Sequence, residues 1–411
     1  MPSQDSQPTT TPASPISDQG GSAPFSPLGV VSPGILVSAI VSTYKSERFI
    51  EGCLEDLTEQ SLFIQGRMEI VIVDSASPEN EASIVRQYQK RHANIAYFRT
   101  PTRETLYAAW NRAIGLSRGR YITNANTDDR HRSDALEIMA SALESNPEVS
   151  LVYANCYLST VPNQTFAENS RTHQYIYPEY FAPAALLHFQ FGPQPMWRKA
   201  VHAQVGYFDA TMKGAGDYDF NLRFAKKCLA QHLPLFLGSY LAHNQAISFA
   251  DNTLAGETQL VWSRYHNDQT IEALYKRAGV ETPTAPEKAR VHLDLGFRAM
   301  SYIAPWGGGR LESNAGLAAK CFIRSFELDP TQPAAWNNLF CLLAASGRTQ
   351  DAQELLRQYA PAANHPTIAA NLRRVVSGNF KGSLVLMPSG LNLPSQHELA
   401  AWGTEQRLMA S

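Results

Sequence analysis

The stretch from Tyr121 to His131, YITNANTDDRH, places two amides and then two adjacent carboxylates directly after a short apolar run. Asp128 and Asp129 repel each other and lose hydration if the fold covers them, so something must compensate for their charge. A divalent ion such as Mg²⁺ or Mn²⁺ can do so, because it prefers oxygen ligands and is commonly held by one or two carboxylates together with substrate phosphates. The alternative for this stretch is an acidic turn that caps the next helix.

Two further carboxylates stand where they could do chemistry. Asp217, in GAGDYDF, follows flexible glycines and precedes an expected helix, so it could act as a general base near a helix N-terminus. Helix capping is the other role for this residue, and Asp219 competes for either one. Asp74 ends another apolar run and could accept hydrogen bonds from a base or a ribose, or cap the helix that follows.

Short β-branched runs alternate with helical stretches from Ile35 onward. Strands are expected at 35–44, 68–74, 94–99, 120–126 and 149–158, and helices at 46–60, 80–92, 103–119 and 132–147. Ser46 is expected to cap the first helix and Gly119 to end the third. The alternation predicts an α/β fold, a mostly parallel sheet with helices on both faces. Ligands bind such sheets beyond the carboxyl ends of the strands, where Thr43 and the acids of the opening stretch fall.

A helical region is expected after the α/β part. Residues 334–366 match one tetratricopeptide repeat, with apolar Trp336 and Leu339 and a turn at Gly347, and the stretches upstream resemble a preceding repeat. Two imperfect repeats would form a small helical appendage. The predicted division is a disordered Pro/Ser/Thr-rich tail, an α/β domain, a tetratricopeptide-like helical region and a C-terminal tail, at 1–34, 35–256, 257–381 and 382–411.

The composition excludes several classes of protein. The 411 residues carry a net charge of −2 with no basic block, which disfavours nucleic acid as a partner. Five scattered cysteines without a C-x-x-C pair are typical of buried free thiols in a reducing compartment. The N-terminus lacks the pattern of a signal peptide, and the apolar stretch at 29–42 is interrupted by Pro33 and Gly34, so no transmembrane segment is expected. A cytoplasmic protein is predicted, with peripheral membrane association left open.

Four sequence blocks taken together resemble the family 2 glycosyltransferases. They are VSAIVSTYKSERFIEGCLEDLTEQ, MEIVIVDSASPEN, AAWNRAIGLSRGRYITNANTDDR and GDYDFNLRFA, in the order and rough spacing of that family. The likeness covers residues 35–249. It implies a GT-A fold, an inverting enzyme that uses a nucleoside-diphosphate sugar, and Mn²⁺ or Mg²⁺ as cofactor. The acceptor would be a saccharide, a lipid-linked molecule or a protein, with surface-polysaccharide assembly as the default setting.

The resemblance also implies roles for individual residues at the donor. Thr43 and Asp74 would line the nucleoside pocket. Asn126 and Asp128 fall on the family's Asp-x-Asp motif, which makes Asp128 the expected metal and donor ligand and Asp129 its neighbour at the metal.

Further residues receive roles at the base, the acceptor and the edge of the donor site. Asp217 falls on the general base of the family. Trp197 and Arg198 suit an acceptor sugar, which would stack on the ring and bond the guanidinium, although a core position is the alternative for Trp197. His243 is a weaker candidate for the metal, with a structural role as its alternative. Asn111, like its helix neighbours, could approach the donor or only pack.

Two departures from the family pattern support a second hypothesis. Asn126 replaces the first acid of Asp-x-Asp, and Gly216 replaces the glutamate that usually precedes the base. The alternative to an enzyme is therefore a non-catalytic, nucleotide-binding domain whose helical repeats bind partner proteins.

Overall fold

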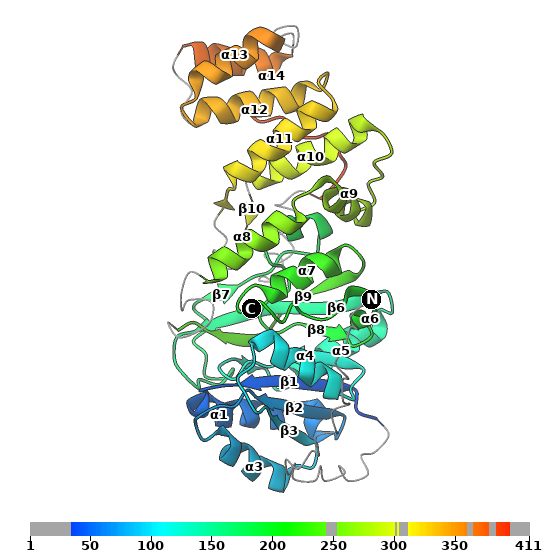
Figure 1. Cartoon of the computed structure of the whole chain (residues 1–411), viewed down its shortest axis with the longest axis vertical. Coiled ribbons are helices and arrows are strands. Elements are labelled where there is room, and N and C mark those ends of the chain that lie inside the picture. The colour runs from blue at the N-terminus through cyan, green and yellow to red at the C-terminus, as the bar shows by residue number, and fades with distance from the viewer. Residues whose placement is uncertain are drawn as a thin grey trace, which may run out of the picture.

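The computed structural model describes residues 34–243, 253–300, 302–303, 311–359, 365–377 and 384–394. An α/β domain forms one end of the elongated molecule, and helices stack away from it toward the other end (Figure 1). The tail predicted at 1–34 lies outside the described residues except for Gly34, and only 384–394 of the predicted C-terminal tail is described.

The sheet of the α/β domain has nine strands in the order β3-β2-β1-β4-β8-β6-β9-β5, with β7 paired to β6. Strands β3, β2, β1 and β4 are parallel, β8 is antiparallel to both β4 and β6, and β9 runs parallel to β6. The strands are β1 (Val37–Thr43), β2 (Met68–Asp74), β3 (Ile95–Arg99), β4 (Tyr121–Asn124), β5 (Arg130–His131), β6 (Val149–Ser159), β7 (Gln174–Tyr175), β8 (Met196–Arg198) and β9 (Leu229–Leu241).

Helices cover both faces of this sheet. Alternate residues of a strand point to opposite faces, so Ile40 and Val71 pack with helix α4 in one core, whereas Ala39 and Ile70 pack with α1, α3 and α5 in another. The helices of the domain are α1 (Glu47–Thr58), α2 (Ser61–Ile64), α3 (Glu81–Arg91), α4 (Leu106–Leu116), α5 (Ala135–Ser145), the 3₁₀ helix η1 (Ala182–Leu186), α6 (Val201–Val205) and α7 (Gly216–Ala225). The predicted α/β class is confirmed.

Two local expectations need correction, and a third, the N-cap of the first helix, is confirmed in its position. The fifth predicted strand, β6, is separated from β4 by β8, because the later segment at 196–198 inserts antiparallel between them. Helix α4 ends at Leu116, and Gly119 serves a different purpose: a Cβ there would lie 2.6 Å from the backbone nitrogen of Ser38. Ser46 occupies the N-cap position of α1, but its hydroxyl donates to the carbonyl of Tyr44.

The helical region contains α8 (Thr253–Tyr265), α9 (Asp268–Arg277), α10 (Ala285–Ala299), α11 (Ala315–Leu328), α12 (Pro333–Ala345), α13 (Thr349–Tyr359) and α14 (Pro366–Val376), with the short strands β10 (Tyr302–Ile303) and β11 (Leu311–Glu312). Helices α12 and α13 are joined by the expected turn at Gly347, whose φ is 79°. The predicted boundary between residues 256 and 257 lies inside α8. Among the helices that the structure describes, none has the length and apolar character needed to cross a membrane.

Candidate active site

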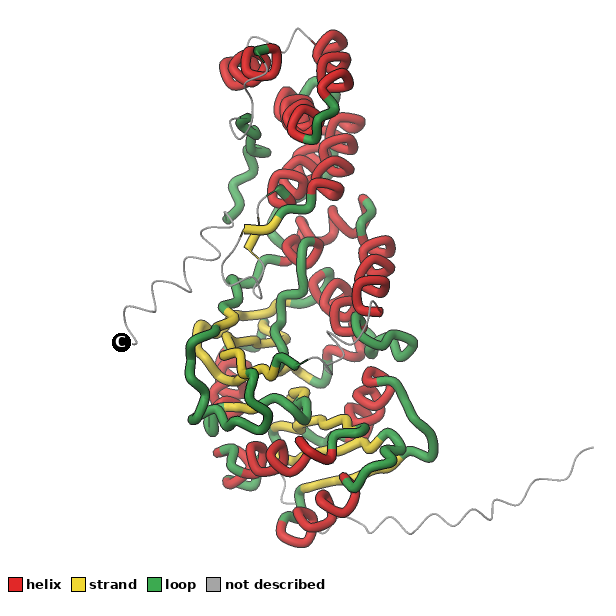
Figure 2. The backbone as a smooth tube through the Cα atoms, turned by 90° about the vertical axis from the view of Figure 1, so that its left-hand side faces the viewer, coloured by secondary structure: helices red, strands yellow, loops and turns green. Residues whose placement is uncertain are grey.

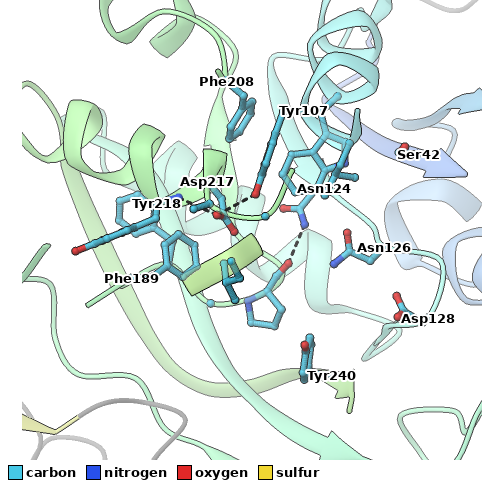
Figure 3. Close-up of a pocket in the computed structure, with 18 of the residues that line it drawn as sticks. Ser42, Tyr107, Asn124, Asn126, Asp128, Phe189, Phe208, Asp217, Tyr218 and Tyr240 are labelled. Carbon is cyan, nitrogen blue, oxygen red and sulfur yellow. Dashed lines mark hydrogen bonds between the residues drawn. The ribbon is translucent and has the colours of Figure 1, made fainter. Parts of the chain in front are cut away.

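A cavity of about 1600 Å³ opens at the carboxyl ends of the parallel strands (Figure 3). It is larger than the ~300–1,000 Å³ of a typical small-molecule site, so it has room for two substrates side by side. Tyr44 after β1, Ser75 after β2 and Asp128 after β4 line it, and Asp217 lines it from the start of α7. Two of the carboxylates that the sequence singled out, Asp128 and Asp217, therefore line one cavity.

Asp128 and His243 form a pair at one end of the cavity. The Oδ2 atom of Asp128 lies 2.9 Å from Nε2 of His243, and the two side chains are 23% and 17% exposed. Nδ1 of His243 is buried and has no hydrogen-bond partner among the described residues. A carboxylate oxygen and an imidazole nitrogen on one wall suit a transition-metal dication, with the remaining positions left to a substrate. No cluster of three or more His, Cys, Asp or Glu side chains is found in the described part of the chain.

Asp129 does not face the cavity, which corrects its expected place at the metal. It is 2% exposed and accepts hydrogen bonds from the amide of Asn126 at 3.0 Å and from the backbone N–H of Leu241 at 3.1 Å. Burial, and then the charge of Asp128, raise the pKa of Asp129 well above its ordinary value. Asp129 thus ties the loop after β4 to the end of β9, and Asp128 is the carboxylate presented to a ligand.

Asp217 is held at the opposite side of the cavity, at the first turn of α7. The hydroxyl of Tyr107 donates to its Oδ1 at 3.1 Å, and the backbone N–H of Tyr218 donates to the same oxygen at 2.8 Å. Both hydrogen bonds reach Oδ1, so Oδ2 is left for the cavity (Figure 3). Burial raises the pKa of Asp217 to about 6 against these two bonds, which lower it. A carboxylate with such a pKa is a stronger base than an exposed aspartate and is still ionised at neutral pH.

The loop that carries Asp217 is fixed from two directions. A Cβ atom at Gly216 would lie 2.6 Å from the ring of Tyr107, so only glycine lets that ring reach the carboxylate. From α8, the carboxylate of Glu257 accepts the backbone N–H groups of Lys213, Gly214 and Ala215 at 2.8–3.1 Å. The sequence did not indicate either contact, because Tyr107 is 110 residues from Asp217 and Glu257 lies across the predicted domain boundary.

The other acid of this turn, Asp219, is turned away from the cavity. Its carboxylate accepts from Arg223 at 2.8 Å and from the hydroxyl of Tyr265 at 2.8 Å. It therefore packs α7 against α8 and does not compete with Asp217 for the role of base.

The two expected nucleoside contacts lie behind the cavity wall. Asp74 is fully buried and accepts from the backbone N–H of Ser77, the hydroxyl of Tyr97 and the guanidinium of Arg99 at 2.5–2.7 Å. Thr43 is also fully buried, and its hydroxyl lies 3.5 Å from Oε1 of Glu81. Neither lines the cavity.

Their neighbours in the sequence do line it. Tyr44 follows Thr43, and Ser75 follows Asp74. Because adjacent residues of an extended chain point to opposite sides, these two neighbours face the cavity. Beside Tyr44, the guanidinium of Arg103 lies 4.1 Å from the ring centroid.

Two more expectations are corrected. Arg198 donates to the backbone carbonyls of Leu143, Asn146 and Val149, and it does not reach the cavity. Asn111 bonds both the N–H and the C=O of Phe208 at 3.0 and 2.8 Å, so it positions that ring and does not line the cavity.

Trp197 has the core position that was its alternative. It is 2% exposed, and its Nε1–H donates to Nε2 of His202 at 2.9 Å, although part of the ring reaches the cavity wall.

The part of the cavity beside Asp217, here called the aromatic half, is lined by Phe189 and Tyr218 (Figure 3) and by Trp262, which bonds Tyr218. Tyr240 and Tyr302 also line the cavity. The hydroxyl of Tyr218 donates to the carbonyl of Ala185 and accepts from Trp262, which joins η1, α7 and α8 around this half.

Comparison with known protein families identifies the family that this domain resembles. Residues 38–206 match the family described as Glycosyl transferase family 2. This part of the chain, residues 38–206, is thus similar to the family 2 glycosyltransferases. The match spans β1 to the region after β8 and so contains Asp128, whereas Asp217 lies just beyond it.

Several known proteins are similar to this chain. An uncharacterized glycosyltransferase of Methanocaldococcus jannaschii is 22% identical over 46% of this chain and 64% of its own length. A poly(ribitol-phosphate) β-glucosyltransferase of Bacillus spizizenii is 33% identical over 24% of this chain and 16% of its own length. The chain thus spans less than two thirds of the length of these relatives. Among solved structures, S. aureus TarS 1–349 in complex with UDP-GlcNAc is similar with a TM-score of 0.48 at 16% identity, over 82% of this chain and 92% of that one.

Proposed function

We propose that the protein is an inverting glycosyltransferase that moves a sugar from a nucleoside-diphosphate sugar to an acceptor hydroxyl. The single observation that carries the proposal is that Asp128 and Asp217 line one cavity large enough for a donor and an acceptor. The names of the relatives, which include a teichuronic acid biosynthesis glycosyltransferase of Bacillus subtilis, favour polysaccharide assembly as the setting. We infer a cytoplasmic enzyme, because nucleotide sugars would have to reach the site.

The donor would lie at the Asp128 end. Arg103 and Tyr44 form a flat, cationic surface there for a base, and Lys45 lines the same part of the cavity, where a diphosphate needs positive charge. Asp128 and His243 would hold a divalent ion against that diphosphate. When bound, the ion would stabilise the negative charge that develops on the departing nucleoside diphosphate. Since His243 supplies nitrogen, and Mg²⁺ strongly prefers oxygen, we expect Mn²⁺ to serve better.

Asp217 would act as the general base. Its free Oδ2 would take the proton of the acceptor hydroxyl while that oxygen forms a bond to the anomeric carbon. The bond from the anomeric carbon to the diphosphate breaks on the opposite face, and the diphosphate leaves with the electron pair. A single displacement of this kind inverts the anomeric configuration. The aromatic half of the cavity adjoins Asp217 and would hold the acceptor, because sugar rings stack on aromatic faces.

The non-catalytic alternative is disfavoured by the surroundings of Asp217. Tyr107, Gly216 and Glu257 together position a carboxylate whose pKa is raised to about 6, and a domain that only binds nucleotide has no need of such a group. The helical region would then be an accessory part, tetratricopeptide-like and able to bind a partner protein.

The test is release of nucleoside diphosphate from a panel of nucleotide sugars in the presence of Mn²⁺. Asp217→Asn should lose at least ~100-fold in turnover, the usual contribution of a positioned base, while donor affinity stays within about twofold. Asp351→Asn removes one exposed carboxylate in α13 and is the matched control, with unchanged turnover. Turnover by Asp217→Asn equal to that of the wild type would overturn the assignment of the base.

A further inference from the structure

Three asparagines of the helical region are buried to 0% exposure, which is unusual for a polar side chain of this kind. Asn337 and Asn338 lie on α12, and Asn371 lies on α14. Asn337 and Asn371 are 34 residues apart and bonded to each other, Nδ2 of Asn371 to Oδ1 of Asn337 at 2.9 Å. A spacing of 34 residues is one tetratricopeptide period, so the two occupy equivalent positions in successive helical pairs.

The asparagines bind the main chain of an extended segment, residues 384–394. Asn371 accepts from the N–H of Val385 at 3.0 Å and donates to its C=O at 2.8 Å. Asn338 does the same at Met387, accepting from the N–H at 2.7 Å and donating to the C=O at 2.8 Å. Asn337 adds a third bond to the carbonyl of Val385 at 3.1 Å. Together the amides bond alternate residues of the segment, Val385 and Met387, in the way a neighbouring β-strand would.

Side chains of the segment contribute less specificity than its backbone. The side chain of Val385 is 48% exposed, whereas Leu384 and Leu386 pack on the small core formed around Phe340. Met387 packs on the main core as well. The contacts therefore require an extended backbone with apolar side chains at positions 384, 386 and 387, and they leave the side chain of Val385 free to vary.

The segment then continues toward the α/β domain. Ser389 donates to Asp294 at 3.0 Å, Arg298 donates to the carbonyl of Pro394 at 2.9 Å, and Leu393 packs beside Phe181 next to η1. Figure 2 shows it as a loop that runs along one side of the helical region.

We propose that the asparagines of α12 and α14 form a binding site for an extended polypeptide main chain, and that this chain's own 384–394 segment occupies the site in cis. The ligand class follows from what the amides need. Asn338 and Asn371 each offer one acceptor and one donor to the N–H and C=O of a single residue, and the two residues they bond, Met387 and Val385, are two positions apart. The site therefore matches an occupant that supplies paired N–H and C=O groups at a two-residue repeat. An extended peptide has that pattern, and sugars and nucleotides lack it. A partner protein would enter by displacing the cis segment with an extended segment of its own.

A cis segment tethered close to its site competes at an effective concentration of about a millimolar. A peptide added in trans should therefore bind the unmodified chain weakly, and it should bind much more tightly once the cis segment can no longer make its backbone bonds. Proline is the substitution that isolates this effect, because it removes an N–H while it keeps the chain extended.

The probe is a fluorescently labelled synthetic peptide of residues 384–394, LVLMPSGLNLP, titrated into full-length proteins and followed by anisotropy. The opened variant carries Val385→Pro and Met387→Pro. The matched control carries Val385→Ala and Met387→Leu, which keep both N–H groups and, at Met387, the side-chain volume. We expect the opened variant to bind the peptide at least roughly tenfold more tightly than the wild type and the control. The same peptide N-methylated at Val385 and Met387 should lose this binding.

Three results would overturn the proposal: no binding to the opened variant at about 1 mM peptide, equal binding by the wild type, or equal binding of the N-methylated peptide. If the opened variant does not fold, hydrogen exchange in the wild type decides. The amides of Val385 and Met387 should then exchange at least ~100-fold more slowly than in the free peptide, and unprotected amides would refute the assignment. Sugar transfer is not needed in any of these measurements, so their outcome is independent of the proposed enzymatic activity.

Discussion

The hydroxyl of Tyr107 offers a sharp test of how Asp217 is tuned. Tyr107→Phe removes one hydrogen bond to Oδ1, 3.1 Å long, and keeps the ring that stacks on Phe208. A hydrogen bond to a charged group contributes ~1.5–3 kcal/mol, and the length of this one favours the lower end. One pKa unit corresponds to about 1.4 kcal/mol, so losing the bond should raise the pKa of Asp217 by about one unit, to about 7.

The sign of the pH effect follows from the role of the carboxylate. A general base must be ionised, so kcat/KM should rise with pH through the pKa of Asp217 and level off above it. In the wild type the midpoint should lie at about 6, and in Tyr107→Phe about one unit higher. At pH 6 the variant should be roughly fivefold slower, whereas at pH 8 the two should differ by only about 10%. Tyr107 does not titrate over this range, because burial raises its own pKa well above the ordinary value.

The assay is the pH profile of kcat/KM for nucleoside diphosphate release between pH 5 and 9. Tyr218→Phe is the matched control: its hydroxyl bonds Ala185 and Trp262 and does not bond Asp217, so the midpoint should not move. The reasoning is refuted if the midpoint of Tyr107→Phe stays within ~0.3 unit of the wild type, or if the variant loses the same fraction of activity at every pH.

Two other predictions concern the base loop and the metal. Gly216→Ala places a Cβ 2.6 Å from the ring of Tyr107, so it should lower the free energy of unfolding by ~1–3 kcal/mol and reduce activity as well. Gly256→Ala, in an open part of helix α8, should raise the free energy of unfolding by ~0.5–1 kcal/mol. Chemical denaturation compares the two variants, and equal stabilities would contradict the packing argument. Calorimetry should show that Mn²⁺ increases the affinity for the donor more than Mg²⁺ does. Asp128→Asn should reduce this effect of Mn²⁺ at least roughly tenfold. A donor affinity that does not change when a chelator is added would exclude a metal ion from donor binding.

Sequence reasoning was most successful where local pattern determines the outcome. Strand β2 was predicted at its observed bounds, Met68–Asp74, because it is a continuous apolar run between turn residues. The rule that ligands bind beyond the carboxyl ends of strands led to Asp128, which lines the cavity. The family resemblance assigned the nucleoside contacts to Thr43 and Asp74, whereas the residues that follow them, Tyr44 and Ser75, line the cavity. The rule specifies the end of a strand but not which face a side chain takes.

The remaining errors involve contacts between distant segments. Strand β8 comes from residues 196–198 and inserts between two strands that precede it, and no local pattern encodes such a crossover. Tyr107 and Glu257 meet the base loop from 110 residues before Asp217 and from the helix after the domain. Contacts of this kind depend on how helices pack across the sheet, so they became visible only in the folded chain.

The two departures from the family pattern each have a partner in this structure. Asn126 donates its amide to Asp129, a buried carboxylate whose pKa is raised by burial and by Asp128. An aspartate at 126 would face that carboxylate as an acceptor without a hydrogen to give, and it would add a further negative charge to a place already crowded with two. Asn126 is therefore the residue that lets Asp129 be buried while Asp128 alone is presented to the cavity.

Gly216, on the other side of the cavity, is also matched by a contact. It replaces the acid that usually precedes the base, and because it has no side chain, the ring of Tyr107 can lie close enough for its hydroxyl to reach Asp217. The backbone ahead of it is then held by a carboxylate from elsewhere, Glu257 of α8. In both places a change of residue type is matched by a contact that keeps one carboxylate available to substrate. Both contacts are consistent with the proposed enzyme, and the turnover of Asp217→Asn decides between it and the non-catalytic alternative.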